Sequence, residues 1–584
     1  MLSALVRFSI ERRAVVLTIA LAVVLYGALR LGDAGLDIFP EFAPQLVIVQ
    51  TEAPGFTAEQ VEVAVSQPLE NALGGLIDLD HIRSESIQGL SIVTLVFSEV
   101  SDTYRNRSQV AERLASVLGA LPEGVEKPVI APLASSSATV RTIAVSSKGA
   151  DPVALRDITE TVVVPRLLAV PGVADVNIFG GAERALVVTP DQRALARAGL
   201  TVLDLSRVVR DAAASPGLGV IENTNQKIAV TAGERALDPG QLSEAVVRME
   251  RDGLLRLRDV AQVAWGSVPR ISAAQFMAEP AVVMMVIGQL GANTLTVSRN
   301  LEQAFADLGP ILAQQDVELH ESLFVPANYI TTAIGDISRH LAIGGAMVLV
   351  VLLISLYNLR TALISALAIP LSLLTAALVL IEMGVNLNVL VIGGLAIALG
   401  EVVDDAIIDT ENIFRRLRQA PADASFETVA LDASLEVRGS VVFATFIVAL
   451  VFVPLLTLGG VSGRLFAPLG LAYILAVLAS LVVAVTVTPA LCVSLLGRQR
   501  MSTDDAPLFR LINPGYSRLV AYLARHSRLA LAISVLSAGF VAAVLPGFGA
   551  RFLPDLREGH FIVHTTTLPG TSLDQSINLG TALT

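Results

Sequence analysis

Seven apolar segments, each long enough to cross a lipid bilayer as a helix, constrain the fold of this chain more than any other feature. A helical span needs roughly 17 to 25 apolar residues with few charges. Hydrophobic residues make up 53% of the sequence and charged residues 16%, whereas soluble proteins carry about 25% charged residues. The sequence therefore predicts a polytopic α-helical membrane protein with spans at 14–31, 341–359, 362–381, 388–410, 439–458, 468–492 and 529–548.

Arginines at the ends of these segments predict the orientation of the chain. Basic residues precede the first and seventh segments and follow the second, fourth and sixth: Arg7, Arg12, Arg13, Arg360, Arg415, Arg416, Arg418, Arg498, Arg500, Arg525 and Arg528. Since positive loops stay in the cytoplasm, the N-terminus is predicted to be cytoplasmic. The first segment has a long apolar core and no clear cleavage pattern, so we expect an uncleaved anchor. The stretch between the first two segments then lies on the far side.

This long stretch has the pattern of mixed α/β structure. Residues 45–51, 81–87 and 90–97 are strand-like, and 57–73 has helical spacing with Thr57 as a plausible N-cap. A strand–helix–strand–strand–helix order is typical of small α+β subdomains in which a sheet packs against helices.

A second α/β unit begins near Val140. We expect a helix in "VPRLLAV", a turn at Pro171-Gly172 and a strand in "VADVNIFG". Residues 253–266 are strand-rich and favour an inserted lobe.

A long-period repeat links the two ends of the sequence. "IFPEF" (38–42) and "APGFTAEQ" (53–60) follow the first apolar segment, and "FLPDL" (552–556) and "LPGTSLDQ" (568–575) follow the seventh. Parallel duplication is common in secondary transporters. We therefore expect one complete repeat and the start of a second, with the rest of a second half missing from this chain.

Four acids stand in or directly after the apolar run of the fourth segment: Glu401, Asp404, Asp405 and Asp409. On a helix Glu401, Asp405 and Asp409 follow one face, and Asp404 lies about 60° from Glu401. Small residues, Gly394 and Ala398, continue this side of the helix and permit a second helix to approach closely.

Acids inside a membrane need either a basic partner or a proton. A carboxylate near the bilayer centre costs about 2.5–3.5 kcal/mol on insertion scales. The only lysines, Lys127, Lys148 and Lys227, belong to the far-side stretch, and no arginine lies inside the five segments between residues 341 and 492. Either the partner belongs to the second half or the acids are protonated part of the time. Both alternatives predict a buried, titrating site.

Asp404 and Asp405 are predicted to be the main residues of this buried, titrating site, with Glu401 and Asp409 as weaker candidates for a relay. The alternative is a helix that ends near Val403 and leaves the acids in a solvated turn. The apolar residues 406–408 and the basic stop at Arg415 argue against it.

Other kinds of site find little support. The net charge of −12 argues against a nucleic-acid partner, and the single cysteine, Cys492, excludes an internal disulfide. His560 and His564 flank a strand-like run, where a spacing of four does not form a ligand pair, so we expect no metal site there. No cofactor is expected.

"GEVVDDAIIDTENIFRRL" (400–417) resembles the fourth-helix motif of the resistance-nodulation-division (RND) efflux transporters of bacterial inner membranes. The resemblance extends along the chain through "FPEF", "APGFTAEQVE", "PGVADVNIFGG" and "LRDVAQV". It implies a homotrimer with ferredoxin-like periplasmic porter subdomains, working with a periplasmic adaptor and an outer-membrane channel. It also implies that Asp404 and Asp405 exchange protons between periplasm and cytoplasm, that their basic partner lies in the second half, and that the protein is no enzyme.

The segments and the resemblance together predict the division of the chain. The predicted parts are 1–38 (cytoplasmic N-terminus and first span), 39–338 (porter domain, with a docking lobe near 181–270), 339–498 (second to sixth spans), 499–528 (cytoplasmic amphipathic linker), 529–548 (seventh span) and 549–584 (start of a truncated second repeat).

The substrate stays open between two classes. The adjacent aspartates resemble the RND branch that exports hydrophobic and amphiphilic compounds, whereas "LPEGVEKPVIAPLASSSATV" is more like the heavy-metal branch. The pair Met284-Met285 is expected to be strand packing and not a metal ligand. An intramembrane aspartyl protease is disfavoured because its aspartates stand on different helices. A proton-driven lipid or protein export accessory remains an alternative.

Overall fold

The computed structural model describes residues 2–583 except 33, 38, 42–44, 150, 215–216, 232–237, 251–252, 271, 422–423, 497–506, 549–560 and 569. The chain divides into two compact units. One comprises Met1–Ala138, Gly288–Thr296 and Pro326–His560, and the other comprises Thr139–Ile287, Val297–Val325 and Phe561–Thr584.

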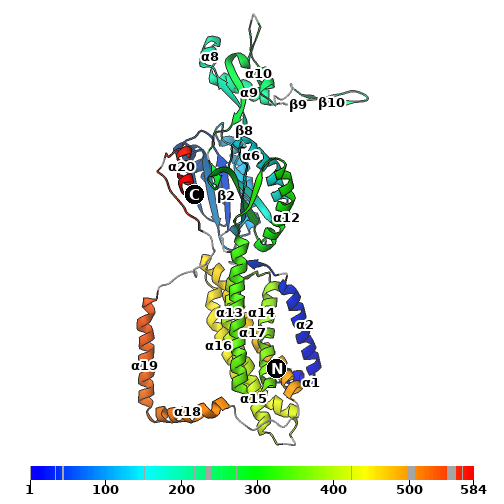
Figure 1. The fold of residues 1–584 in the computed structure, drawn as a ribbon, viewed down its shortest axis with the longest axis vertical. Coiled ribbons are helices and arrows are strands. Elements are labelled where there is room, and N and C mark those ends of the chain that lie inside the picture. The colour runs from blue at the N-terminus through cyan, green and yellow to red at the C-terminus, as the bar shows by residue number, and fades with distance from the viewer. Residues whose placement is uncertain are drawn as a thin grey trace. The chain divides into compact units, whose positions relative to one another are not determined.

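Helices form at all seven predicted apolar segments, which confirms the polytopic helical membrane protein (Figure 1). Six helices in the described part of the chain are long and apolar enough to cross a membrane: α2 (Arg13–Gly32), α13 (Pro326–Leu356), α14 (Leu359–Glu382), α16 (Phe426–Leu456), α17 (Gly460–Leu496) and α19 (Ser527–Val544). The remaining segment forms α15 (Val389–Gln419), which is long enough to span but carries the acids.

Two helices begin well before the spans predicted within them. Helix α13 begins at Pro326 and not near residue 341, and α16 begins at Phe426 and not near residue 439. In both helices the polar or charged residues of the first turns lower the local hydropathy, although the backbone is already helical. A short helix that was not predicted, α1 (Leu2–Glu11), buries Val6 and Ile10 among side chains of α16 and α17.

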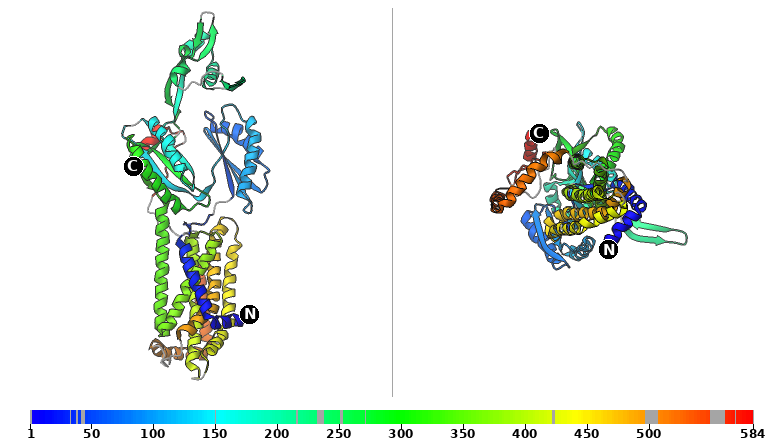
Figure 2. Two further views of the ribbon diagram at one scale, coloured as in Figure 1. Left: turned by 90° about the vertical axis from the view of Figure 1, so that its right-hand side faces the viewer. Right: turned by 90° about the horizontal axis from the view of Figure 1, so that it is seen from below.

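Helix α17 is the centre of the bundle. It packs against α14, α15 and α16, and these helices run side by side in Figures 1 and 2. Small residues on α17, among them Ala472 and Ala476, are fully buried beside Val391, Leu395 and Ala398 of α15. The predicted close helix contact at Gly394 and Ala398 is therefore confirmed.

Gly394 is the tightest point of this contact and gives the first testable prediction. A Cβ atom at this position would lie 2.5 Å from the carbonyl oxygen of Leu469 and 3.1 Å from the Cβ of Ala472. We expect Gly394→Ala to push α15 and α17 apart and to lower stability by about 1–3 kcal/mol, as overpacking does. The thermal unfolding of the purified protein in detergent measures this loss.

The neighbouring glycine supplies the matched control. A Cβ atom at Gly393 meets no atom within 4 Å, so Gly393→Ala adds the same methyl group to the same helix without a clash. Equal unfolding temperatures for the two variants would contradict the close contact.

The first sheet has the order β3-β4-β2-β5, and every neighbouring pair is antiparallel. Its strands are β2 (Leu46–Glu52), β3 (Leu79–Ile87), β4 (Leu90–Phe97) and β5 (Val129–Ile130), and its helices are α3 (Ala58–Val61), α4 (Gln67–Leu73) and α5 (Thr103–Val117). The three predicted strands and the helix at 57–73 are confirmed. Thr57 caps α3 in a reciprocal capping box with Gln60, as its position predicted.

The second sheet has the order β14-β15-β6-β16, with β7 also paired to β15. Its strands are β6 (Ala134–Ser146), β7 (Val173–Gly180), β14 (Ala274–Phe276), β15 (Glu279–Gln289) and β16 (Glu318–Phe324), with the helices α6 (Pro152–Ile158), α7 (Val164–Leu168) and α12 (Thr294–Ala313). The predicted helix, turn and strand between residues 164 and 180 are confirmed. Met284 is fully buried in β15, as expected for strand packing.

Both sheet units share one local irregularity. Helix α3 passes through a π-helical turn, Glu62–Ser66, into α4, whose second residue is Pro68. Helix α6 passes through the π-helical turn Thr159–Val163 into α7, whose second residue is Pro165. Proline cannot donate the i→i−4 hydrogen bond, so a wider turn is accommodated at the same place in each unit.

Residues 184–267 build a further small core around Leu195, Leu205, Leu242, Leu257 and Val260. Its elements are β8 (Arg184–Pro190), α8 (Gln192–Ala198), α9 (Val202–Ala213), β9 (Gly217–Glu222), β10 (Lys227–Thr231), α10 (Pro239–Ser243), β11 (Val246–Glu250), β12 (Gly253–Arg256), α11 (Leu257–Val260) and β13 (Ala261–Ser267). The first strand of this segment, β8, pairs antiparallel with its last strand, β13. The two ends of the segment therefore lie next to each other.

The C-terminal part contains α18 (Pro507–Arg525), α19 and α20 (Leu573–Leu583). All residues of α19 are described, and none of them is buried. The second copy of the repeat lies partly outside the described residues, including all of "FLPDL" at 552–556. The predicted start of a second repeat therefore stays a prediction.

Candidate functional site

Helix α15 positions the four acids of the predicted site. Asn388 caps its N-terminus, where the side-chain Oδ1 accepts a hydrogen bond from the backbone N–H of Val391 at 2.9 Å. The helix then continues without interruption to Gln419. The acids are therefore parts of one helix, and the alternative of a solvated turn after Val403 is wrong.

The structure separates the acids by burial. Asp405 and Asp409 are 6% and 1% exposed, Glu401 is half-buried, and Asp404 is exposed. The shared inward face of Glu401, Asp405 and Asp409 is confirmed. The expectation that Asp404 is buried with Asp405 is wrong, because adjacent helical residues point about 100° apart and Asp404 falls on the outer side.

Asp409 forms an ion pair inside the bundle. Its Oδ1 atom accepts a hydrogen bond from Nη2 of Arg438 at 3.0 Å and another from the hydroxyl of Ser434 at 3.0 Å. Both partners come from α16, and Arg438 is only 3% exposed. The guanidinium also donates to the backbone oxygen of Ala484 in α17 at 3.2 Å, so it connects three helices.

Arg438 is the residue that sequence reasoning missed. The fifth span was predicted to begin at residue 439, which left Arg438 just outside the membrane and assigned any basic partner to a second half. In the structure α16 begins twelve residues before Arg438 and places it opposite Asp409. The only signal in the sequence is that Arg438 follows three acids, Glu427, Asp432 and Glu436, and directly precedes the apolar run 439–458.

Asp405 lies one helical turn before Asp409 and interacts with a different neighbour. The Ser480 side chain of α17 forms a hydrogen bond with the Asp405 carboxylate. Arg438 acts on Asp405 by its charge, as do Glu401 and Asp404. A carboxylate with one hydroxyl partner and a nearby cation can exist both with and without a proton.

Hydroxyl groups surround the cluster on the side of α14. Thr410 donates to the backbone oxygen of Ala406 at 2.6 Å, and Ser365 of α14 donates to the same oxygen at 3.2 Å. Both side chains are fully buried. They add polarity to the interior without adding charge.

The end of α15 is held by polar contacts with α16. Asn412 is only 4% exposed, and its side-chain amide donates to the backbone oxygen of Ala433 at 2.7 Å. Arg416 pairs with Glu436 through its Nε atom at 2.8 Å. These contacts fix the last turns of α15 against α16.

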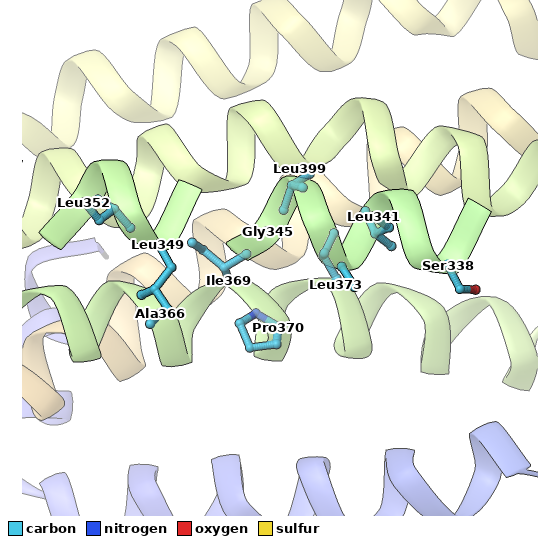
Figure 3. Close-up of a pocket in the computed structure, with 11 residues that line it drawn as sticks. Ser338, Leu341, Gly345, Leu349, Leu352, Ala366, Ile369, Pro370, Leu373 and Leu399 are labelled. Atoms are coloured by element: carbon cyan, nitrogen blue, oxygen red, sulfur yellow. The ribbon is translucent and has the colours of Figure 1, made fainter. Parts of the chain in front are cut away.

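An apolar cavity of about 370 Å³ lies on another side of α15, between α13 and α14 (Figure 3). Leu399 contributes to it from α15, and Pro370 lines it from α14. Ser338 is the only polar side chain among its described lining residues. The cavity therefore offers no set of ligands for a cation.

The described residues contain no group of three or more histidine, cysteine, aspartate or glutamate side chains placed to hold a metal ion. Of the pair His560 and His564, His560 lies outside the described residues.

Comparison with known proteins gives the family. The sequence profile of the AcrB/AcrD/AcrF family matches residues 5–584. The chain belongs to this family. The resemblance to RND efflux permeases is thereby confirmed, and with it the fold class.

Similar curated members of the family include three proteins whose alignments cover 99% of this chain. Protein HelA of Legionella pneumophila is 30% identical, the cobalt-zinc-cadmium resistance protein CzcA of Cupriavidus metallidurans is 28% identical, and the cation efflux system protein CusA of Escherichia coli is 28% identical. The alignments cover 56%, 55% and 56% of those proteins. The chain thus spans about half the length of the curated relatives that it matches.

Proposed function

We propose that this chain forms the first half of a permease that exports heavy-metal cations across the bacterial inner membrane in exchange for protons. The observation that carries the proposal is the pair of buried carboxylates, Asp405 and Asp409, in a membrane helix. Buried ionisable groups in membrane helices are characteristic of proton pathways. The class of substrate follows the names of CzcA and CusA, which describe cation resistance and cation efflux.

Asp405 is the proposed main proton carrier. When it binds a proton, one negative charge disappears from the interface of α15, α16 and α17. Loss of the proton restores that charge, and the helices repack around it. Asp404, on the exposed flank of the same turn, is the proposed second carrier, which exchanges protons with its surroundings. No covalent step is needed, so the protein acts as a transporter and not as an enzyme.

Topology and partners are part of the proposal. The N-terminus is cytoplasmic, and the sheet units lie in the periplasm, where a homotrimer meets an adaptor protein and an outer-membrane channel. The arginine distribution supports the orientation. Membership of the family supports the assembly.

Transport by the full-length protein in proteoliposomes tests the substrate. With an imposed proton gradient, we expect transport of zinc, cobalt or cadmium ions and no transport of a hydrophobic cationic dye. Metal flux is followed with a metal-sensitive fluorophore and dye flux by fluorescence quenching. Transport of the dye without transport of any of the metals would assign the protein to the other class of substrate.

A further inference from the structure

The buried cluster contains two acids and one base. Asp405, Asp409 and Arg438 are all at most 6% exposed, and only Asp409 is directly paired with the arginine. When Asp405 carries a proton, one anion faces one cation. When Asp405 is ionised, two anions share one cation in an interior where unpaired charge is costly.

Three polar atoms of this cluster are buried without a hydrogen-bond partner among the described residues: Oδ2 of Asp405, Oδ2 of Asp409 and Nε of Arg438. Nη2 of Arg438 makes all of the hydrogen bonds found for this side chain: to Asp409, to Ser434 at 2.6 Å and to Ala484. The buried Nε–H of the guanidinium thus remains as a donor for a carboxylate that lies one helical turn from Asp409.

We propose that Arg438 is a positioning residue for the proton site, shared between Asp409 and Asp405 according to the proton on Asp405. While Asp405 is protonated, Arg438 pairs with Asp409. When Asp405 loses its proton, the guanidinium turns so that Nε donates to Oδ2 of Asp405. Nη2 stays hydrogen-bonded to Asp409. Asp409 is then a permanent anion that anchors Arg438, and not a relay. The inference rests on the proposed function, since it assumes that Asp405 exchanges protons.

The neighbouring groups fit this division of roles. Glu401 and Asp404 on α15 face Asp405 with negative charge, Arg438 on α16 is its positive neighbour, and α17 contributes the hydroxyl of Ser480. Asp409 is faced by Arg438 from α16 and by the thiol of Cys492 from α17. Among these groups only Arg438 supplies a positive charge.

The arrangement connects the proton to the helix packing. Arg438 holds Ala484 of α17 through the same Nη2 atom that binds Asp409. A turn of the guanidinium toward Asp405 therefore changes the contact between α16 and α17. Binding or loss of a proton at Asp405 of α15 therefore changes the packing between α16 and α17.

Infrared difference spectroscopy of the full-length protein in membranes tests the inference directly. The carboxylic-acid C=O stretching band that disappears in Asp405→Asn reports the proton on Asp405. In Asp409→Asn, Asp405 is the only carboxylate that remains to pair with Arg438. The positive charge then stabilises the ionised form of Asp405. We expect the midpoint pH of the Asp405 band to fall by about 1 unit or more relative to the wild type. Asp432→Asn, which removes an exposed charge from α16, should leave the midpoint unchanged.

A second variant covers the case in which Asp409→Asn does not fold. Arg438→Lys keeps the charge that pairs with Asp409 but lacks the planar fork that serves two carboxylates. We expect the midpoint of the Asp405 band to rise. Unchanged midpoints in the variants that fold would overturn the inference and leave the proposed function intact. Absence of any Asp405-dependent band would overturn both.

Discussion

Asp405→Asn is expected to abolish proton-coupled export by the full-length protein while the protein still folds and inserts. Asparagine has nearly the same shape as aspartate and still accepts a hydrogen bond from Ser480, but it cannot bind and release a proton. The bundle therefore stays in the arrangement of the protonated state. Metal flux in proteoliposomes under an imposed proton gradient should fall to the level of vesicles without protein.

The matched control for this loss is Asp432→Asn. It makes the same chemical change on the neighbouring helix α16, where the side chain is exposed. Export by this variant should equal that of the wild type. Undiminished export by Asp405→Asn would remove Asp405 from the proton pathway.

Arg438→Met is expected to cause the largest loss of stability among single substitutions in the bundle. It leaves the Asp409 carboxylate, which is 1% exposed, without its positive partner. Removal of one member of a buried ion pair typically costs about 3–5 kcal/mol, because the remaining charge stays buried. The unfolding temperature in detergent and the yield of protein in the membrane should both fall sharply.

The double variant Asp409→Leu/Arg438→Met separates the effect of the unpaired charge on stability from the effect of lost packing. Buried ion pairs can often be replaced by apolar residues of similar volume without loss of stability. We expect the double variant to recover most of the unfolding temperature lost in Arg438→Met. A double variant as unstable as the single one would show that Arg438 stabilises the bundle through its other contacts, with Ser434 and Ala484.

The membrane helices were predictable because an apolar run of this length can cross a bilayer only with its backbone hydrogen bonds satisfied, and a helix satisfies them within the run itself. Their ends were not, since charged residues can be helical and buried when a partner is near. Glu427, Asp432 and Glu436 lower the hydropathy at the start of α16, and the predicted span therefore began one residue after Arg438. Only the three-dimensional contact with Asp409 shows that this arginine lies inside the bundle.

The acidic site was predictable in part for a similar reason. Helical periodicity correctly placed Glu401, Asp405 and Asp409 on one face, because it depends only on local geometry. Which side of α15 faces α16 and α17 depends on contacts distant in sequence, such as that of Gly394 with Leu469. For that reason periodicity did not reveal that Asp404 is exposed while Asp405 is buried.

Strands β3 and β4 were predictable because residues 81–87 and 90–97 are each strand-like in their local sequence. The turn between them contains Gly89, where a positive φ of 77° suits glycine. The order β3-β4-β2-β5 was not predictable, because the pairing of β2 with β4 and β5 joins residues distant in the chain. The same holds for the pairing of β8 with β13.

The ion pair of Asp409 and Arg438 also bears on the biogenesis of the protein. Each residue alone would oppose entry of its helix into the bilayer by up to about 2.5–3.5 kcal/mol, the cost that insertion scales give for a charge at the helix centre. Helices α15 and α16 are consecutive, and only residues 420–425 connect them. We expect the two helices to leave the insertion machinery together as a hairpin whose charges are already neutralised. The pair would then help both helices to enter the membrane before it takes any part in transport.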